Sequence, residues 1–209
     1  MAEEWDVCVP DDQLDAATQL FETAPLSARF ERVNSPDPMP VSLRHRFPTF
    51  KLKGVIFYFL LAPSSDCFID PRPQFCERSQ MGISYPRDVY FARSLLVKQD
   101  GADLEDFVDA HNSSVEWGES NLNFPELQTQ GTKYAVRKNE QITSDKRFHV
   151  LLQVNCDFAA EWTRTVEGKE GRIEPLKQGR YLTRWRSKAR PVDPRLPDPK
   201  GRNKFRDYV

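Results

Sequence analysis

Two acidic side chains near the start of the chain have the spacing of a metal-binding pair. Glu4 and Asp6 alternate with apolar residues in the segment 4–9, which is predicted to be a β-strand. Side chains two positions apart on a strand point to the same face and lie about 7 Å apart. Two carboxylates in that arrangement can share magnesium, which prefers oxygen ligands, and the metal can hold phosphate groups for an in-line transfer. The alternative is a pair of solvated acids, because so short a pattern also arises by chance.

A basic segment near the C-terminus, RYLTRWRSKARP, is the second candidate site. Its cationic and aromatic side chains are interleaved, which suits contact with nucleic-acid phosphates and stacking on bases. The candidate binding residues are Arg180, Arg184, Trp185, Arg186, Lys188 and Arg190. The same residues also fit a nuclear import signal, contacts with the acidic part of the chain itself, or a free solvated tail.

The net charge of −1 conceals an uneven distribution of charge along the chain. Residues 171–209 contain 12 Lys and Arg against 4 Asp and Glu, whereas residues 1–170 contain 18 against 27. An acidic main part would repel nucleic acid, so contacts between the basic segment and the protein's own acidic surface are favoured over nucleic-acid binding. A protein partner of the basic segment is the other interpretation that we retain.

Other catalytic patterns are missing from the sequence. It contains no glycine-rich phosphate loop, dinucleotide-binding fingerprint or nucleophile elbow. The four cysteines lack CxxC or zinc-like spacing, which predicts reduced, unpaired thiols. The acidic residues within 103–109 are interpreted as the solvated face of a helix. No cofactor is therefore expected, apart from magnesium if the pair Glu4 and Asp6 is functional.

The hydrophobic patterns around the acid pair predict an α/β (α+β) fold, with a small mixed sheet and flanking helices. A helix at about 12–23, capped by Asp11 or Asp12, should follow the strand at 4–9. The run GVIFYFLLA at 54–62 is the strongest strand signal, and its continuous apolar character predicts burial on both faces. We expect these two strands to share a sheet, with the helix packed against it.

The rest of the chain is predicted to combine loops and helices. A further strand is expected at 28–33 and a long ordered loop at 63–85. One helix is expected to have Pro86 in its first turn, and another is expected from Asp103, which can serve as a cap. The polar stretch 125–147 is ambiguous.

Residues 1–190 are expected to form one domain, followed by a basic, proline-rich and disordered tail at 191–209. The longest apolar run, at 55–62, has 8 residues, whereas a membrane-spanning helix needs about 20. The first residues, MAEEWDVCVP, are acidic where a secretory signal is basic. We therefore expect a cytoplasmic or nuclear protein that is not secreted and has no membrane partner.

Several segments of the chain resemble nucleotidyltransferase-like proteins. WDVCVPDDQLDAATQLF resembles the strand and helix of that superfamily, and Glu4-Trp5-Asp6-Val7 matches its acid-hydrophobic-acid-hydrophobic motif. The stretches RFPTFKLKGVIFYFLLAPSSDC, ERSQMGISYPRDVYFARSLL, LEDFVDAHN and VEWGESNLNF resemble a group of uncharacterised fungal proteins related to that fold. The resemblance covers most of residues 3–125. It implies a nucleotidyltransferase-like fold with Glu4 and Asp6 at the metal site.

Two departures from the family pattern predict impaired catalysis. The family's Gly-Ser pair, which grips the phosphates, precedes the acid pair, whereas only three residues precede Glu4, as expected for an N-terminally truncated member. The third carboxylate should lie on a later strand, but VIFYFLL contains no acid and Asp66 lies beyond it. We expect a catalytically impaired nucleotidyltransferase-like protein. The alternatives are a protein-interaction module that uses the basic tail and an active magnesium-dependent nucleotidyltransferase.

Overall fold

The computed structural model describes residues 3–34, 43–145 and 150–177. Its strands are β1 (Glu3–Val9), β2 (Phe30–Val33), β3 (Thr49–Leu52), β4 (Phe57–Pro63), β5 (Cys76–Arg78) and β6 (Ser84–Pro86). Its α-helices are α1 (Leu14–Glu22), α2 (Leu26–Arg29), α3 (Ser64–Cys67), α4 (Asp88–Lys98), α5 (Gly101–Ala110), α6 (Val115–Asn121), α7 (Phe124–Thr143), α8 (Phe158–Glu167) and α9 (Lys169–Lys177). The short 3₁₀ turns are η1 (Asp11–Gln13), η2 (Arg44–Arg46) and η3 (Pro73–Phe75). The predicted mixed α+β class is confirmed, and the basic tail lies outside the described residues.

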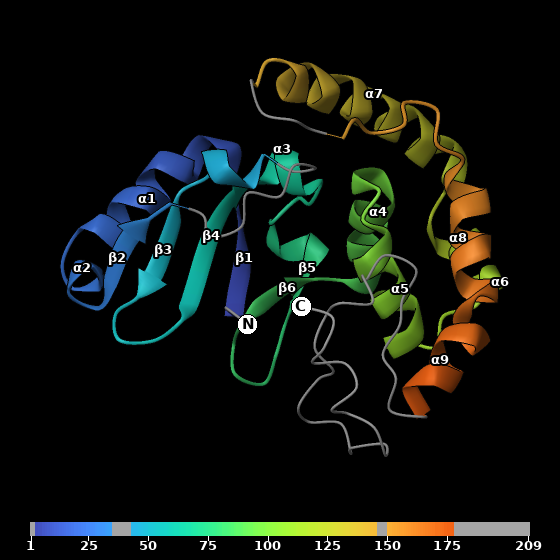
Figure 1. Cartoon of the computed structure of the whole chain (residues 1–209), viewed down its shortest axis with the longest axis horizontal. Coiled ribbons are helices and arrows are strands. Elements are labelled where there is room, and N and C mark those ends of the chain that lie inside the picture. Colours follow the sequence, from blue (N-terminus) through green and yellow to red (C-terminus); the bar gives the residue numbers. More distant parts are fainter. Residues whose placement is uncertain (1–2, 35–42, 146–149, 178–209) are drawn as a thin grey trace, which may run out of the picture.

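A four-stranded mixed sheet forms one half of the molecule (Figure 1). The strand order is β1-β4-β3-β2, in which β1 and β4 are parallel and the other neighbours are antiparallel. The register pairs Glu3 with Phe57 and Val9 with Pro63, so both strands end at the same edge of the sheet. The prediction that the first strand and the run GVIFYFLLA share a sheet is confirmed, although β4 begins three residues later than expected.

Helix α1 covers one face of this sheet, as predicted. Buried Val9, Phe50 and Leu61 form a small core with apolar side chains of the helix. The ring of Phe21 stacks on Phe50, with 4.6 Å between their centroids. Because Val7 and Val9 point to this side, the intervening side chains of β1 point to the opposite face.

A helical half holds the larger core. Helices α4, α5, α7 and α8 pack together around buried side chains, among them Leu95, Leu96, Phe107, Leu127 and Trp162. Helix α7 runs from this half towards the sheet and ends near α3 (Figure 1). Among the described residues, no helix is both long and apolar enough to cross a bilayer.

Two segments differ from the sequence-based expectation. Residues 63–85 were expected to form a loop, but they contain α3 and the hairpin of β5 and β6, which turns at Gly82 with a φ of 79°. The ambiguous stretch 125–147 lies mainly in one 20-residue helix, α7. Its hydrophobic pattern is weak because its buried positions include Gly131 and Lys138. Asn123 caps its first turn, which contains Pro125.

Helix α5 also departs from expectation in its cap and its acidic face. Asp100, not Asp103, is the N-cap, and its carboxylate accepts from the Asp103 amide. The acidic residues of α5 are only partly solvated, because Glu105 is 5% exposed. Arg172 of α9 lies 2.7 Å from Asp109 and 3.8 Å from Glu105, so part of the acidic face contacts α9.

Candidate functional site

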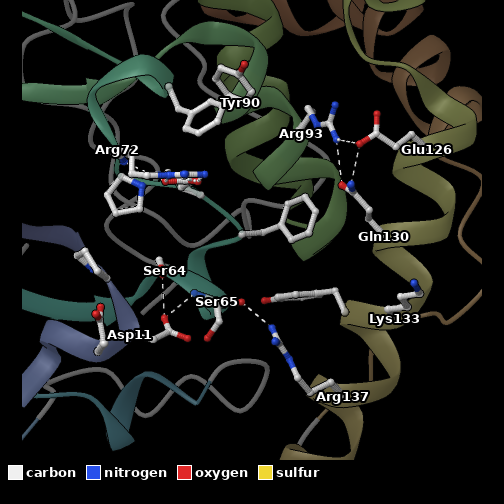
Figure 2. A pocket seen from close by; sticks show the side chains of 18 residues that line it. Asp11, Ser64, Ser65, Arg72, Tyr90, Arg93, Glu126, Gln130, Lys133 and Arg137 are labelled. Carbon is white, nitrogen blue, oxygen red and sulfur yellow. Dashed lines mark hydrogen bonds and ion pairs between the residues drawn. The ribbon is translucent and has the colours of Figure 1, made fainter.

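A cleft of about 1030 Å³ opens where β1 and β4 end (Figure 2). Residues 10–12, which follow β1, and the start of α3, which follows β4, form one wall. Helix α7 forms the facing wall, and α4 with the segment 68–75 closes the third side. Ligands of open α/β sheets bind in the crevice beyond the carboxyl ends of parallel strands, and this cleft occupies the corresponding place beside β1 and β4, which makes it the candidate site.

Asp11 ties the ends of the two parallel strands together. Its Oδ1 accepts hydrogen bonds from the Ser64 hydroxyl and from the Ser65 amide, each 2.9 Å long. The predicted helix cap is therefore wrong, because the carboxylate reaches across to the next strand and does not cap η1 or α1. Partial burial raises the pKa of Asp11, but the bonds from Ser65 and Ser64 and the charge of Arg137 outweigh it and hold the pKa below its usual value.

Two cations on α7 face this wall. Lys133 and Arg137 lie one helical turn apart, and both are exposed. The Nη2 of Arg137 donates to the Ser65 carbonyl oxygen over 2.7 Å, and its guanidinium lies 5.6 Å from the ring centroid of Tyr134. In the part of the chain that the structure describes, the ammonium of Lys133 has no hydrogen-bond or ion-pair partner. These two side chains therefore retain donors for an anionic ligand.

The other two arginines of the cleft already have acidic partners. Arg93 contacts Gln130 at 2.9 Å and Glu126 at 3.3 Å. Arg72 pairs with the carboxylate of Asp70, and this hydrogen bond raises the arginine pKa above its usual value. Because acidic side chains neutralise these two arginines, the positive charge that remains available to a ligand in the cleft lies on α7.

Aromatic rings supply the apolar part of the cleft. The rings of Phe75 and Tyr90 meet edge to face at 4.9 Å, and those of Phe68 and Tyr134 meet at 5.8 Å. The Tyr134 hydroxyl donates to the Asp66 carbonyl oxygen over 2.8 Å. Burial raises the pKa of Tyr134, so this hydroxyl remains protonated and acts as a fixed donor. The cleft thus combines cations, hydrogen-bond acceptors and flat apolar surfaces.

The predicted metal pair lies elsewhere. Glu4 and Asp6 are in β1, where they pair with Tyr58 and Leu60 of β4. The Asp6 carboxylate accepts two hydrogen bonds from Arg44, each 2.5 Å long, and it does not line the cleft. Both of its oxygens are thus engaged by a guanidinium.

Asp66 does not complete a metal site with Glu4 and Asp6. Asp66, which follows β4, forms an ion pair with Lys138 of α7. Within 3–34, 43–145 and 150–177, no three His, Cys, Asp or Glu side chains form a group that could hold a metal. The candidate tail residues, from Arg180 to Arg190, lie outside the described residues.

Magnesium alone should leave the stability of the protein unchanged. The Arg44 guanidinium already neutralises the Asp6 carboxylate, so a metal would have to displace it. We expect millimolar MgCl₂ to shift the melting temperature of the wild type no more than it shifts that of Asp6→Asn. A ligand at 100 times its dissociation constant adds about 2.7 kcal/mol, which is easily measured. A magnesium-dependent rise that Asp6→Asn abolishes would contradict this expectation.

The cleft residues were missed because they come from distant parts of the sequence. Asp11 and Ser64 are separated by 53 positions and meet only because β1 and β4 are parallel. The usable signal was the pair of stretches, PDD and SSD, that directly follow the two parallel strands. Lys133 and Arg137 lie in the stretch whose helical pattern was ambiguous.

Comparison with models of known families gives no match for this chain, and searches of curated proteins and of solved structures give none either. The function must therefore be inferred from the geometry of the cleft.

Proposed function

We propose that the protein is a catalytically impaired nucleotidyltransferase-like protein whose cleft binds a phosphorylated ligand of the nucleotide class. The observation that carries this proposal is the pair Lys133 and Arg137, which line the cleft on α7 with donors available, and of which Arg137 reaches Ser65 on the opposite wall (Figure 2). The class of ligand is inferred from the resemblance to nucleotidyltransferase-like proteins. The residues that line the cleft supply the contacts to that ligand.

The chemistry of the cleft matches the three parts of a nucleotide. Lys133 and Arg137 supply charge-assisted donors for phosphate oxygens. Asp12, exposed on the opposite wall, offers acceptors for sugar hydroxyls. The rings of Phe75 and Tyr90 offer surfaces on which a base can stack. A cleft of about 1030 Å³ has room for such a ligand.

Two observations favour binding without metal-dependent transfer. The carboxylate of Asp6 is held by Arg44, outside the cleft. The strand that pairs with β1 presents Tyr58, Leu60 and Ala62 opposite residues 4, 6 and 8, so it contributes no acid beside the pair. The proposed phosphate-binding side chains therefore lie at a different place from the acid pair.

Nucleotide binding can be measured by calorimetry with ATP, GTP, CTP and UTP, each with magnesium. We expect at least one triphosphate to bind the wild type, with a stronger affinity than its nucleoside. The double variant Lys133→Gln/Arg137→Gln should lose roughly 100-fold in affinity, because a hydrogen bond to a charged group contributes about 1.5–3 kcal/mol.

Arg78→Gln is the matched control for this double variant. Arg78 is exposed on β5 and does not line the cleft, so its loss should leave the affinity unchanged. The proposed ligand class is wrong if no triphosphate binds, or if the double variant binds as tightly as the control. Release of pyrophosphate by the wild type, abolished by Asp6→Asn, would instead identify an active transferase.

A further inference from the structure

Two cysteines that are far apart in the sequence lie near each other, one in β1 and one at the end of α3. Cys8 of β1 pairs in register with Ala62 of β4, and the Sγ of Cys67 lies 3.9 Å from the Ala62 carbonyl oxygen. The Sγ of Cys8 lies 3.7 Å from the carbonyl oxygen of Ile69, two residues after Cys67. These contacts place both sulfurs at the end of β4, at the start of the segment that follows α3.

The surroundings give the two thiols different roles. The interaction between the two thiols lowers the pKa of Cys67 and raises the pKa of Cys8. The charge of Lys98, at the end of α4, lowers the pKa of Cys67 further. A thiolate is the nucleophilic form of cysteine, so the lower pKa favours Cys67 over Cys8 as the attacking sulfur.

Both thiols can be reached, and the backbone around them is fixed. Cys8 and Cys67 are half-buried, whereas Cys156 is buried in the helical half. The Ser94 hydroxyl donates to the Cys67 carbonyl oxygen over 2.6 Å and anchors the end of α3 to α4. The pair is therefore held together by the fold in its reduced form.

We propose that Cys8 and Cys67 form a peroxide-sensitive dithiol that closes to an intramolecular disulfide. The Cys67 sulfur attacks one oxygen of a hydroperoxide, the O–O bond breaks, and the departing oxygen takes a proton and leaves as water or alcohol. Cys67 is then a sulfenic acid. The Cys8 thiol attacks that sulfur, the S–O bond breaks, and the hydroxyl group leaves as water with the Cys8 proton. Two thiols are oxidised and one peroxide is reduced.

Formation of the disulfide would affect the cleft wall that contains α3. Cys67 is followed by Phe68, which lines the cleft. It is preceded by Asp66, whose carbonyl oxygen accepts a hydrogen bond from Tyr134 and whose carboxylate forms an ion pair with Lys138 of α7. A covalent bond from Cys8 would fix the end of α3 to β1 at this point. The inference does not depend on the identity of the ligand, since disulfide formation is measured directly.

The test is mapping of disulfides in the full chain after treatment with hydrogen peroxide. We expect the wild type to lose two of its four free thiols and to regain them with dithiothreitol. The protein should be alkylated and cleaved with chymotrypsin, which cuts after Phe68 and Phe75. Trypsin would leave Cys67 and Cys76 in one peptide, because Arg72 precedes Pro73. Mass spectrometry should then find a peptide that joins Cys8 to Cys67.

Three variants separate the roles of the thiols. Cys8→Ser should stop at a Cys67 sulfenic acid that dimedone traps, and Cys67→Ser should retain all three remaining thiols. Cys156→Ser, the control in the helical half, should form the same disulfide as the wild type. The proposal is overturned if the wild type retains four thiols, or if Cys67 is joined to Cys76 or to a second chain. The wild-type map decides this even if a variant fails to fold.

Discussion

Gly118→Ala should destabilise the protein by about 3 kcal/mol, the upper part of the range for an overpacked core. A Cβ at Gly118 of α6 would lie 2.2 Å from Nε1 and 2.5 Å from Cδ1 of Trp162. The indole cannot move away easily, because Trp162 is fully buried and its Nε1 donates to the Ser114 carbonyl oxygen over 3.2 Å. Urea denaturation monitored by circular dichroism measures the loss.

Gly171→Ala is the matched control for this substitution. Gly171 also lies in a helix, α9, but a Cβ there meets nothing within 4 Å. Alanine should therefore stabilise the protein by up to about 1 kcal/mol through its higher helix propensity. In a Trp162→Phe background, Gly118→Ala should cost less, because part of the clashing ring is gone. Equal effects at Gly118 and Gly171 would show that α6 does not pack against Trp162 as described.

Lys138→Met should also destabilise the protein by about 3 kcal/mol, since it leaves one partner of a buried ion pair behind. The Lys138 side chain is 7% exposed, and its ammonium pairs with Asp66, whose side chain is 20% exposed. Few water molecules can replace the lost ammonium around that carboxylate. Thermal and urea unfolding of the variant measure the effect.

The double variant Lys138→Met/Asp66→Asn tests whether the charge itself is responsible. It should be more stable than Lys138→Met, because it removes the unpaired carboxylate. Arg32→Met provides a control at the surface, where Arg32 pairs with Glu22 and both are largely exposed. That change should cost less than about 1 kcal/mol. A similar loss in Lys138→Met and Arg32→Met would mean that the pair with Asp66 contributes no more than a surface pair.

The sheet could be predicted from sequence because its signals are local. The run that contains β4 is continuously apolar, and the strand before α1 ends at a proline. Both patterns follow from burial and from backbone chemistry within a few residues. Helix α7 was ambiguous because its buried side chains are interrupted by a glycine and a lysine, Gly131 and Lys138, which tertiary contacts accommodate.

The candidate site could not be predicted to the same degree, because it depends on contacts between distant segments. The pair Glu4 and Asp6 has the spacing of a metal site, but spacing does not reveal that Arg44 binds Asp6. The spacing of residues also does not reveal that Asp11 accepts a hydrogen bond from Ser64. Nor does it reveal that Lys133 lines the same cleft as these two residues. These facts follow from the strand order and from the path of α7, which no short pattern specifies.

The parallel pairing of β1 with β4 also determines the order in which the sheet can assemble. The antiparallel strands β3 and β4 are joined by four residues, whereas 47 residues separate β1 from β4. Closing the longer loop costs about 2 kcal/mol more in chain entropy. On a ribosome, β1 is made first but has no partner until β4 has emerged. The N-terminal strand is therefore expected to dock late, onto a hairpin that has already formed, and this docking brings Asp11 to Ser64 and Cys8 to Cys67.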